Sequence, residues 1–221
     1  MRLVVARTPL KGILKWAQRA LLACAVLLLG YCGFVLVDAW IFQNRESGRL
    51  ERLLRDRRAA DKGQPQARSA TQIEAPPAIE PDGLIGRIEI PRLGLSAIVA
   101  EGTDKTTLRR AVGHIPGTAL PGQPGNAGLA GHRDSFFRPL RDILQNDMIT
   151  LTTLRGEYRY RVVSTQIVVP TEVSVLNPTG NESLTLVTCY PFYFVGAAPS
   201  RFIVRAERVA GSAGAPQTES P

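Results

Sequence analysis

The hydrophobic and polar positions divide the chain into two unlike parts. Residues 20–37 form a run of 18 residues without a charge, and residues 38–42 extend its apolar character. About 20 apolar residues are enough for a helix to cross the hydrocarbon core of a bilayer. The pattern therefore predicts one transmembrane helix over residues 20–42.

A cleaved signal peptide is the alternative for this run, and the length of the run argues against it. The hydrophobic region of a signal peptide has about 7–15 residues and ends at a cleavage site between small residues. The run here is longer, and residues 34–37, Phe-Val-Leu-Val, offer no such site. Cys24 follows Leu-Leu-Ala as in a lipoprotein cleavage site, but Arg19 leaves almost no hydrophobic region before it. A retained signal anchor is the better interpretation.

Basic residues predict the orientation of this anchor. Residues 1–19 hold five Lys or Arg and no acid, whereas the basic residues over 45–62 are interleaved with acids. Because cytoplasmic flanks are enriched in Lys and Arg, residues 1–19 should stay in the cytoplasm and everything after Phe42 should lie outside. We expect a single-pass protein of the cell membrane with an extracytoplasmic domain.

The segments on either side of that domain have their own composition. Residues 43–82 should form a stalk and linker: leucines at helical spacing over 44–60 predict a helical stalk, and 61–82 contain Pro and few large apolar residues. Residues 210–221 are small and polar and predict a disordered tail.

A mostly β domain is predicted over residues 83–209, where apolar and polar side chains alternate with period two. The alternation and the β-branched or aromatic runs are clearest at residues 87–90, 148–152, 158–162, 167–169, 184–188 and 202–204. Short helices are predicted over 107–112 and 136–144, and the Pro- and Gly-rich segment 115–126 is a predicted loop. Many short strands with little helix favour a closed or partly open barrel, although the pattern alone does not distinguish it from a sandwich.

The net charge of +8 invites a nucleic-acid interpretation, but the location of the charge argues against one. Residues 1–62 carry +7 of it, and residues 63–221 carry only +1. The basic residues therefore flank the predicted membrane segment, where they favour an anionic lipid surface. No basic face interleaved with aromatic residues stands out, so nucleic acid is not an expected partner.

Cysteine usage points to one thiol. Cys24 and Cys32 fall in the predicted span, so Cys189 is the only cysteine outside it. A single thiol makes no disulfide within the domain, and a leftover cysteine in an exported domain is either reactive or an inert buried residue. The sequence has no HExxH motif, no paired Cys motif and no acidic cluster, so neither a metal nor another cofactor is expected.

The surroundings of Cys189 favour the reactive interpretation. Cys189 ends the run Thr-Leu-Val-Thr-Cys, with His132 57 residues before it and Arg201 12 residues after it. A thiolate attacks a carbonyl, a His handles protons and an Arg stabilises developing negative charge, so these residues supply three parts of a thiol acyl-transfer site.

At these residues the sequence resembles the sortase family of transpeptidases, which cut a C-terminal sorting signal and join the protein to an amine. The family's T-L-x-T-C motif falls on residues 185–189, its Arg on Arg201 and its His on His132, and the blocks 111–118 and 126–134 resemble class D sortases. The resemblance, which covers about residues 84–208, implies a sortase-like eight-stranded β-barrel with short helices. It also implies a catalytic role for all three residues, with His132 protonating the leaving amine.

That resemblance defines the expected partners. The substrates would be exported proteins with an LPxTG-like C-terminal sorting signal, and the acceptor would be a primary amine of the cell wall or of a surface protein. Some sortases use calcium, but no acidic cluster here supports that. Four residues are further candidates for substrate binding: His114, Thr188, Phe192 and Tyr193.

Several alternatives stay open at this level. Arg205 shares the strand face of Arg201, so spacing does not choose between them, and Asp134 is more consistent with a surface role than with orienting His132. A cysteine endopeptidase with water as acceptor would use the same residues, and a non-catalytic β-domain would hold an unreactive Cys189. A papain-like enzyme is disfavoured because its Cys precedes its His.

Overall fold

The structure is a computed structural model that describes residues 10–62, 83–193 and 196–209. Most of the predicted linker and all of the predicted tail lie outside the described residues, as do the first nine residues of the basic N-terminus. The described chain forms two compact units, residues 1–41 and 42–221, which we describe separately.

The first unit is the N-terminal part of one long helix, α1 (Leu10–Lys62). Within the described residues, α1 is the one helix long and apolar enough to cross a membrane, with an 18-residue window of mean hydropathy 2.6. Its apolar side chains point outward all round, and Leu21, Leu27 and Leu29 are each more than two thirds exposed. A helix that is hydrophobic on every side requires an apolar environment. It is therefore a candidate for the predicted membrane span.

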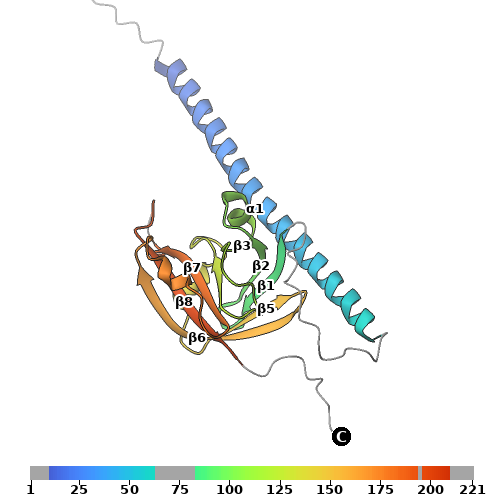
Figure 1. Ribbon diagram of the computed structural model, residues 1–221. Helices are drawn as coiled ribbons and strands as arrows, with labels where there is room; N and C mark the ends of the chain where they lie inside the picture. Colours follow the sequence, from blue (N-terminus) through green and yellow to red (C-terminus); the bar gives the residue numbers. More distant parts are fainter. Residues whose placement is uncertain (1–9, 63–82, 194–195, 210–221) are drawn as a thin grey trace, which may run out of the picture. The chain divides into compact units, whose positions relative to one another are not determined.

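The second unit contains a closed barrel of eight strands in the order β1-β2-β3-β4-β7-β8-β6-β5 (Figure 1). This confirms the predicted mostly β, eight-stranded architecture and excludes the sandwich. The strands are β1 (Leu84–Ile90), β2 (Leu95–Glu101), β3 (Val112–His114), β4 (Asn126–Ala130), β5 (Met148–Thr153), β6 (Gly156–Val168), β7 (Ser183–Tyr190) and β8 (Ser200–Arg208).

Alternating side chains fill the barrel. In β1 every second residue from Leu84 to Ile90 is buried, as the period-two pattern predicts. The interior is packed with apolar side chains from all parts of the wall, including Ile88, Val99, Val112, Leu129, Leu151, Val162, Leu184, Leu186 and Val204. A filled interior leaves the outer face of the wall as the place for chemistry.

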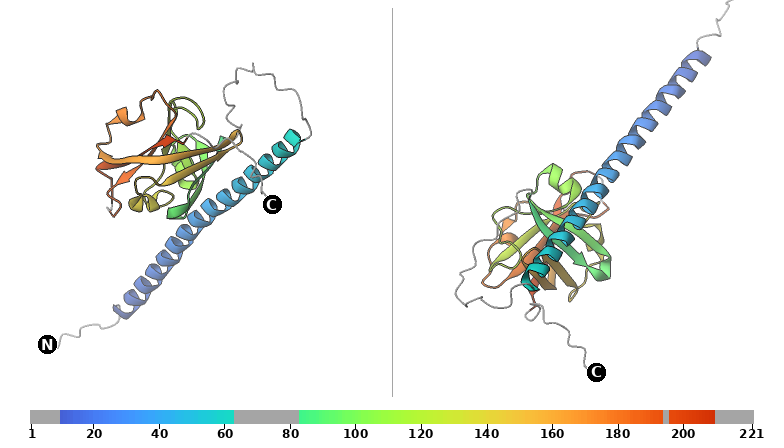
Figure 2. Two further views of the ribbon diagram at one scale, coloured as in Figure 1. Left: turned by 90° about the horizontal axis from the view of Figure 1, so that it is seen from below. Right: turned by 90° about the vertical axis from the view of Figure 1, so that its right-hand side faces the viewer.

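Two features of the barrel differ from the simple pattern. The runs predicted at 158–162 and 167–169 fall almost entirely in the single 13-residue strand β6, the long strand in the left view of Figure 2, which pairs with β5 and β8. Most neighbouring strands are antiparallel, but β2 pairs with β3, and β4 with β7, in parallel. Alternation within one strand carries no information about such pairings.

The short helices lie near their predicted positions. The first, α2 (Lys105–Arg110), begins two residues early because the Asp104 side chain caps it by accepting from the backbone N–H groups of Thr106 and Thr107. The second, η2 (Arg138–Asp142), is a 3₁₀ helix that covers only the middle of the predicted segment. Two further 3₁₀ turns, η1 (Pro91–Leu93) and η3 (Val173–Leu176), were not predicted.

The C-terminal part of α1 belongs to the second unit and is more than a stalk. Leu50 is fully buried and forms a second small core, with Leu84, Ile98, Ala100 and Ala111. Gln43 connects this part of α1 to β2 and α2. Its side chain accepts a hydrogen bond from the backbone N–H of Ile98 at 2.9 Å and donates one to the Arg110 carbonyl at 2.6 Å. The helical prediction over 44–60 is thus confirmed, and its narrow apolar face packs against the barrel.

Candidate active site

Cys189 lies on the outer face of the barrel wall, near the end of β7. Leu184 and Leu186 point into the core, and Cys189 has the opposite parity along the strand. The residue is partly exposed, as a nucleophile must be to meet a substrate. Since β7 lies between β4 and β8, residues of two neighbouring strands flank the thiol.

The register of β7 and β8 separates the two arginine candidates. Arg201 is the cross-strand partner of Cys189, whereas Arg205 is opposite Thr185. Paired residues present their side chains on the same face of a sheet. Arg205 is therefore four residues further along, or roughly 13 Å at about 3.3 Å per residue. The register places Arg201 beside the thiol and Arg205 away from it.

His132 lies on the other side of Cys189. The parallel β4–β7 pairing matches Ala130 with Val187, and the Gly131 N–H extends the ladder by donating to the Val187 carbonyl at 3.1 Å. His132 follows two residues after this pair, at the beginning of the turn that leaves β4. The His132 side chain is exposed. The three predicted catalytic residues thus come from adjacent parts of the wall, with the thiol in the middle.

The turn that carries His132 is fixed by buried contacts. The Thr188 hydroxyl donates to the Gly131 carbonyl at 2.7 Å, and the backbone N–H of Phe137 donates to the His132 carbonyl at 3.2 Å. A Cβ on Gly131 would lie 2.7 Å from the Phe137 ring, so any side chain there would displace the ring. Glycine at position 131 therefore leaves room for the Phe137 ring to pack against the turn.

Comparison with known proteins identifies the family of the chain. The sortase domain model matches residues 88–209, which is more than half of the chain. The chain belongs to the sortase family. It is 32% identical to Sortase D of Bacillus subtilis over 197 residues, covering 86% of this chain and 96% of that protein.

Solved structures with a similar fold are also sortases. The fold is similar to a Sortase D5 transpeptidase of Clostridium perfringens, with a TM-score of 0.53, 32% identity and coverage of 58% of this chain and 79% of that one. It is also similar to Sortase A from Corynebacterium diphtheriae, with a TM-score of 0.55, 31% identity and coverage of 60% and 64%. The family consists of cysteine transpeptidases, and this chain is a sortase-type enzyme.

Three of the predicted substrate-binding residues of this sortase lie near Cys189 in different environments. Thr188 is buried and points inward to Gly131. Phe192 is half-buried, and its ring is 5.4 Å from that of Phe202 in an edge-on contact. Tyr193 is largely exposed and accepts a hydrogen bond from Arg141 at 3.0 Å. Their contact with a substrate stays a prediction.

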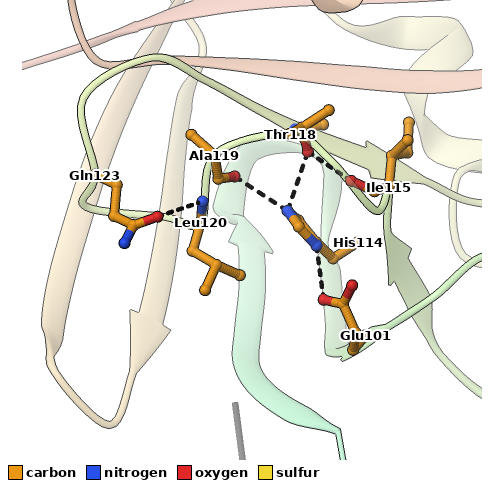
Figure 3. A network of polar contacts seen from close by, with 8 residues as sticks. Glu101, His114, Ile115, Thr118, Ala119, Leu120 and Gln123 are labelled. Carbon is orange, nitrogen blue, oxygen red and sulfur yellow. Dashed lines mark hydrogen bonds and ion pairs between the residues drawn. The ribbon is translucent and has the colours of Figure 1, made fainter. Parts of the chain in front are cut away.

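The fourth candidate, His114, is buried in a polar network (Figure 3). Its Nδ1 lies 2.7 Å from a carboxylate oxygen of Glu101, and its Nε2 lies 3.0 Å from both the Ala119 carbonyl and the Thr118 hydroxyl. These contacts tie β3 to β2 and to the following Pro- and Gly-rich loop. A role in the substrate groove stays a prediction, and the geometry itself indicates a structural one.

Two further polar residues, Arg133 and Asp134, follow His132 directly in the chain. The Asp134 side chain is 72% exposed and pairs with Arg133 at 3.6 Å, which is consistent with the expected surface role. Among the described residues, no group of three or more His, Cys, Asp and Glu side chains is arranged to hold a metal ion. The sequence analysis did not identify Arg133 as a candidate residue. Its position directly after His132 was the one signal in the sequence that could have done so.

Proposed function

We propose that this sortase is a membrane-anchored transpeptidase that cleaves an LPxTG-like C-terminal sorting signal of exported proteins and transfers the acyl group to an amine. The observation that carries the proposal is the position of Cys189 on β7, between β4 and β8, with Arg201 as its cross-strand partner on β8 and the His132 turn following β4. This is the arrangement that thiol acyl transfer requires.

The reaction would proceed in two steps on the same face. The Cys189 thiolate attacks the scissile carbonyl, a C–S bond forms, and Arg201 stabilises the negative charge that develops on the oxygen. When the C–N bond breaks, His132 gives a proton to the leaving amine, and the acyl group remains on sulfur as a thioester. An acceptor amine then attacks the thioester and gives a proton to His132, which the first step left neutral, and the C–S bond breaks to release the Cys189 thiolate.

The anchor would keep this chemistry at the membrane. The apolar part of α1 would span the bilayer, with residues 1–19 in the cytoplasm and the barrel on the outer side of the cell membrane. Its partners would be the lipid bilayer, the exported substrates, and an amine of cell-wall peptide, of a pilin-like Lys or of another surface component. Neither nucleic acid nor a cofactor takes part in the proposed reaction.

The full chain in detergent provides the test. A peptide ending in an LPxTG-like signal should add covalently to the wild type, as a mass gain, and the acyl group should pass to added oligoglycine, diaminopimelate peptide or Lys peptide. Cys189→Ala should lose both products and keep its fold. A variant with Cys24 and Cys32 replaced by Ala is the matched control and should keep both products.

Each alternative function has its own result in that experiment. If only hydrolysed peptide forms, at one rate with every amine, the protein is an endopeptidase with water as acceptor. If Cys189 reacts neither with the peptide nor with a mild thiol reagent, the domain is non-catalytic. An adduct retained in Cys189→Ala would refute the assignment of the nucleophile.

A further inference from the structure

Arg133, the residue directly after His132, has an unusual environment for an arginine. It is only 7% exposed, although its neighbours His132 and Asp134 are both exposed. Its two terminal nitrogens donate to two backbone carbonyls, Nη1 to Pro191 at 2.9 Å and Nη2 to Gly196 at 3.0 Å. Both acceptors lie on the connection between β7 and β8, which begins just after Cys189.

The contacts of Arg133 complete a bracket around the candidate site. On one side of His132, Gly131 binds the two residues before Cys189, through Val187 O and Thr188 Oγ1. On the other side of His132, Arg133 binds Pro191, two residues after Cys189. His132 therefore lies between two residues that are hydrogen-bonded to the segment around Cys189, Gly131 to the residues before the thiol and Arg133 to a residue after it. Loss of the hydrogen bonds of either Gly131 or Arg133 would allow His132 to move relative to the Cys189 thiol.

The chemistry of arginine suits this task. A buried cation is stable only when it is paired and hydrogen-bonded, and Arg133 has two carbonyls and the Asp134 carboxylate at 3.6 Å. The planar guanidinium presents several donors in a fixed fork, so one side chain can hold Pro191 and Gly196 together. A Lys ammonium is a single point on a flexible stem and does not copy this geometry.

We propose that Arg133 is a positioning residue that sets His132 against Cys189 by fastening the His132 turn to the β7–β8 connection. It acts through His132 and does not contact the substrate. This inference rests on the proposed function, because it takes His132 as the group that protonates the leaving amine. Loss of the fork therefore slows the step in which a proton is transferred and leaves the thiol itself intact.

The test compares two substrates with leaving groups of different basicity on the full chain in detergent. An amide leaves as an amine and needs a proton, whereas a thioester of the same acyl peptide leaves as a thiolate and needs none. Arg133→Met keeps the bulk of the side chain and removes its donors, and Arg133→Lys keeps the charge and removes the fork. The exposed Arg138→Met, in η2 of the same segment, is the matched control.

We expect Arg133→Met to lose roughly 10²-fold in acylation by the amide, within the range of about 10²–10⁴ that a positioned proton donor contributes. Acylation by the thioester should change by only a few fold. Arg133→Lys should restore little of the amide rate, and Arg138→Met should match the wild type on both substrates. An equal loss on both substrates, an unchanged amide rate, or unfolding of both Arg133 variants would overturn the proposal.

A second readout needs no sorting-signal substrate and so separates this proposal from the proposed function. In a background without Cys24 and Cys32, the alkylation rate of Cys189 by a small thiol reagent is followed against pH. A well-placed His132 shapes this profile through its charge, so Arg133→Met should shift it towards the profile of His132→Ala. If the wild type acylates with neither peptide, the proposed function fails, while this shift still supports the positioning role. If the pH profile of Arg133→Met matches that of the wild type while the profile of His132→Ala differs, the positioning role is contradicted.

Discussion

At the scale of single residues, the strand register distinguishes two arginines that side-chain identity alone does not separate. Arg201 and Arg205 have the same chemistry and the same strand face, yet only Arg201 is the cross-strand partner of Cys189. The Arg201 side chain also donates to the carbonyls of Ala198 and Ser200, at 3.3 and 3.0 Å, which fixes it at the beginning of β8. These two hydrogen bonds restrict the orientation of the guanidinium, which the proposed role in stabilising developing negative charge requires.

Arg201→Lys should therefore be strongly impaired although it keeps its charge. Loss of one donor to a developing oxyanion commonly costs about 10²–10³ in rate, and the Lys ammonium lacks the planar fork. Acylation rates with a sorting-signal peptide measure the effect. Arg205→Lys is the matched control and should stay within a few fold of the wild type. Equal losses in the two variants would contradict the assignment drawn from the register.

The candidate site shows how far sequence reasoning reaches. The order of His132, Cys189 and Arg201 along the chain was enough to nominate the three residues, and the structure places them on adjacent parts of one wall. The burial of His114 and the bracket formed by Arg133 could not be predicted, because both depend on contacts between segments far apart in sequence. Those contacts follow from the parallel β2–β3 and β4–β7 pairings, which leave no signal in any single strand.

At the scale of elements, strands with an alternating, β-branched or aromatic run were predicted, and β2 was not. The alternation in β1 comes from one face packed in the barrel, so the pattern and the strand agree. β2 is buried at four consecutive positions, Ala97 to Ala100, since α1 covers its outer face through Leu50. That contact removes the period-two signal, which explains why this strand was missed.

An ion pair joins η1 to the loop that precedes β5. Arg92 of η1 donates to both carboxylate oxygens of Asp147, with the Nη2 contact at 2.6 Å, and the backbone N–H of Leu144 donates to the same carboxylate at 2.8 Å. The Asp147 side chain is 6% exposed. The hydrogen bond from Arg92 is the largest cause that holds the pKa of Asp147 below its usual value.

This pair predicts a pH dependence of stability. Because the folded state lowers the pKa of Asp147, its contribution should be complete above the unfolded value of about 4 and should be lost as pH falls through the lower folded value. Asp147→Asn should thus reduce the free energy of unfolding at pH 7, and the gap to the wild type should narrow towards pH 2–3. Urea unfolding at several pH values measures it.

A surface pair provides the control for that measurement. Glu157 pairs with Arg159 at 2.8 Å, and both side chains are more than two fifths exposed. Exposed pairs contribute little to stability, so Glu157→Gln should have a much smaller effect at pH 7. A gap between Asp147→Asn and the wild type that stays constant down to pH 2 would mean that the Asp147 carboxylate is not the source of the stability.

Leu50 gives a second prediction at this scale. It is the fully buried residue through which α1 contacts Leu84, Ile98, Ala100 and Ala111. Truncation of a buried leucine to alanine costs about 2–5 kcal/mol, so Leu50→Ala should lower the free energy of unfolding of the barrel by an amount in that range. Chemical unfolding of the full chain in detergent, followed by the fluorescence of a probe on Cys189, reports on the barrel.

The control for Leu50 is a residue of the same helix that contacts water. Arg58 is exposed, and Arg58→Ala should change stability by no more than about 0.5 kcal/mol. A fragment that starts at residue 83 lacks the whole contact and should unfold at least as easily as Leu50→Ala. If that fragment is as stable as the full chain, the contact between α1 and β2 does not stabilise the barrel in solution.

At the scale of the whole molecule, the chain combines a candidate membrane span with a barrel domain. The apolar part of α1 exposes its leucines on every side, whereas the barrel buries its own apolar side chains in a closed core. The net charge is divided evenly between the two units, because residues 1–41 carry +4 and residues 42–221 carry +4. The uninterrupted basic flank before the candidate span predicts a cytoplasmic N-terminus and a barrel on the outside.

The orientation can be tested through Cys189, the one cysteine outside the apolar segment. In a variant with Cys24 and Cys32 replaced by Ala, a membrane-impermeant thiol reagent should label Cys189 in intact cells or spheroplasts, because the residue is partly exposed on the barrel wall. Cys189→Ala in the same background should remain unlabelled. A cysteine introduced near the N-terminus, at Arg7, should become labelled only after the membrane is opened. Labelling of Cys189 only after lysis would place the barrel in the cytoplasm, where it could not meet exported substrates, and would remove the basis for a sorting role.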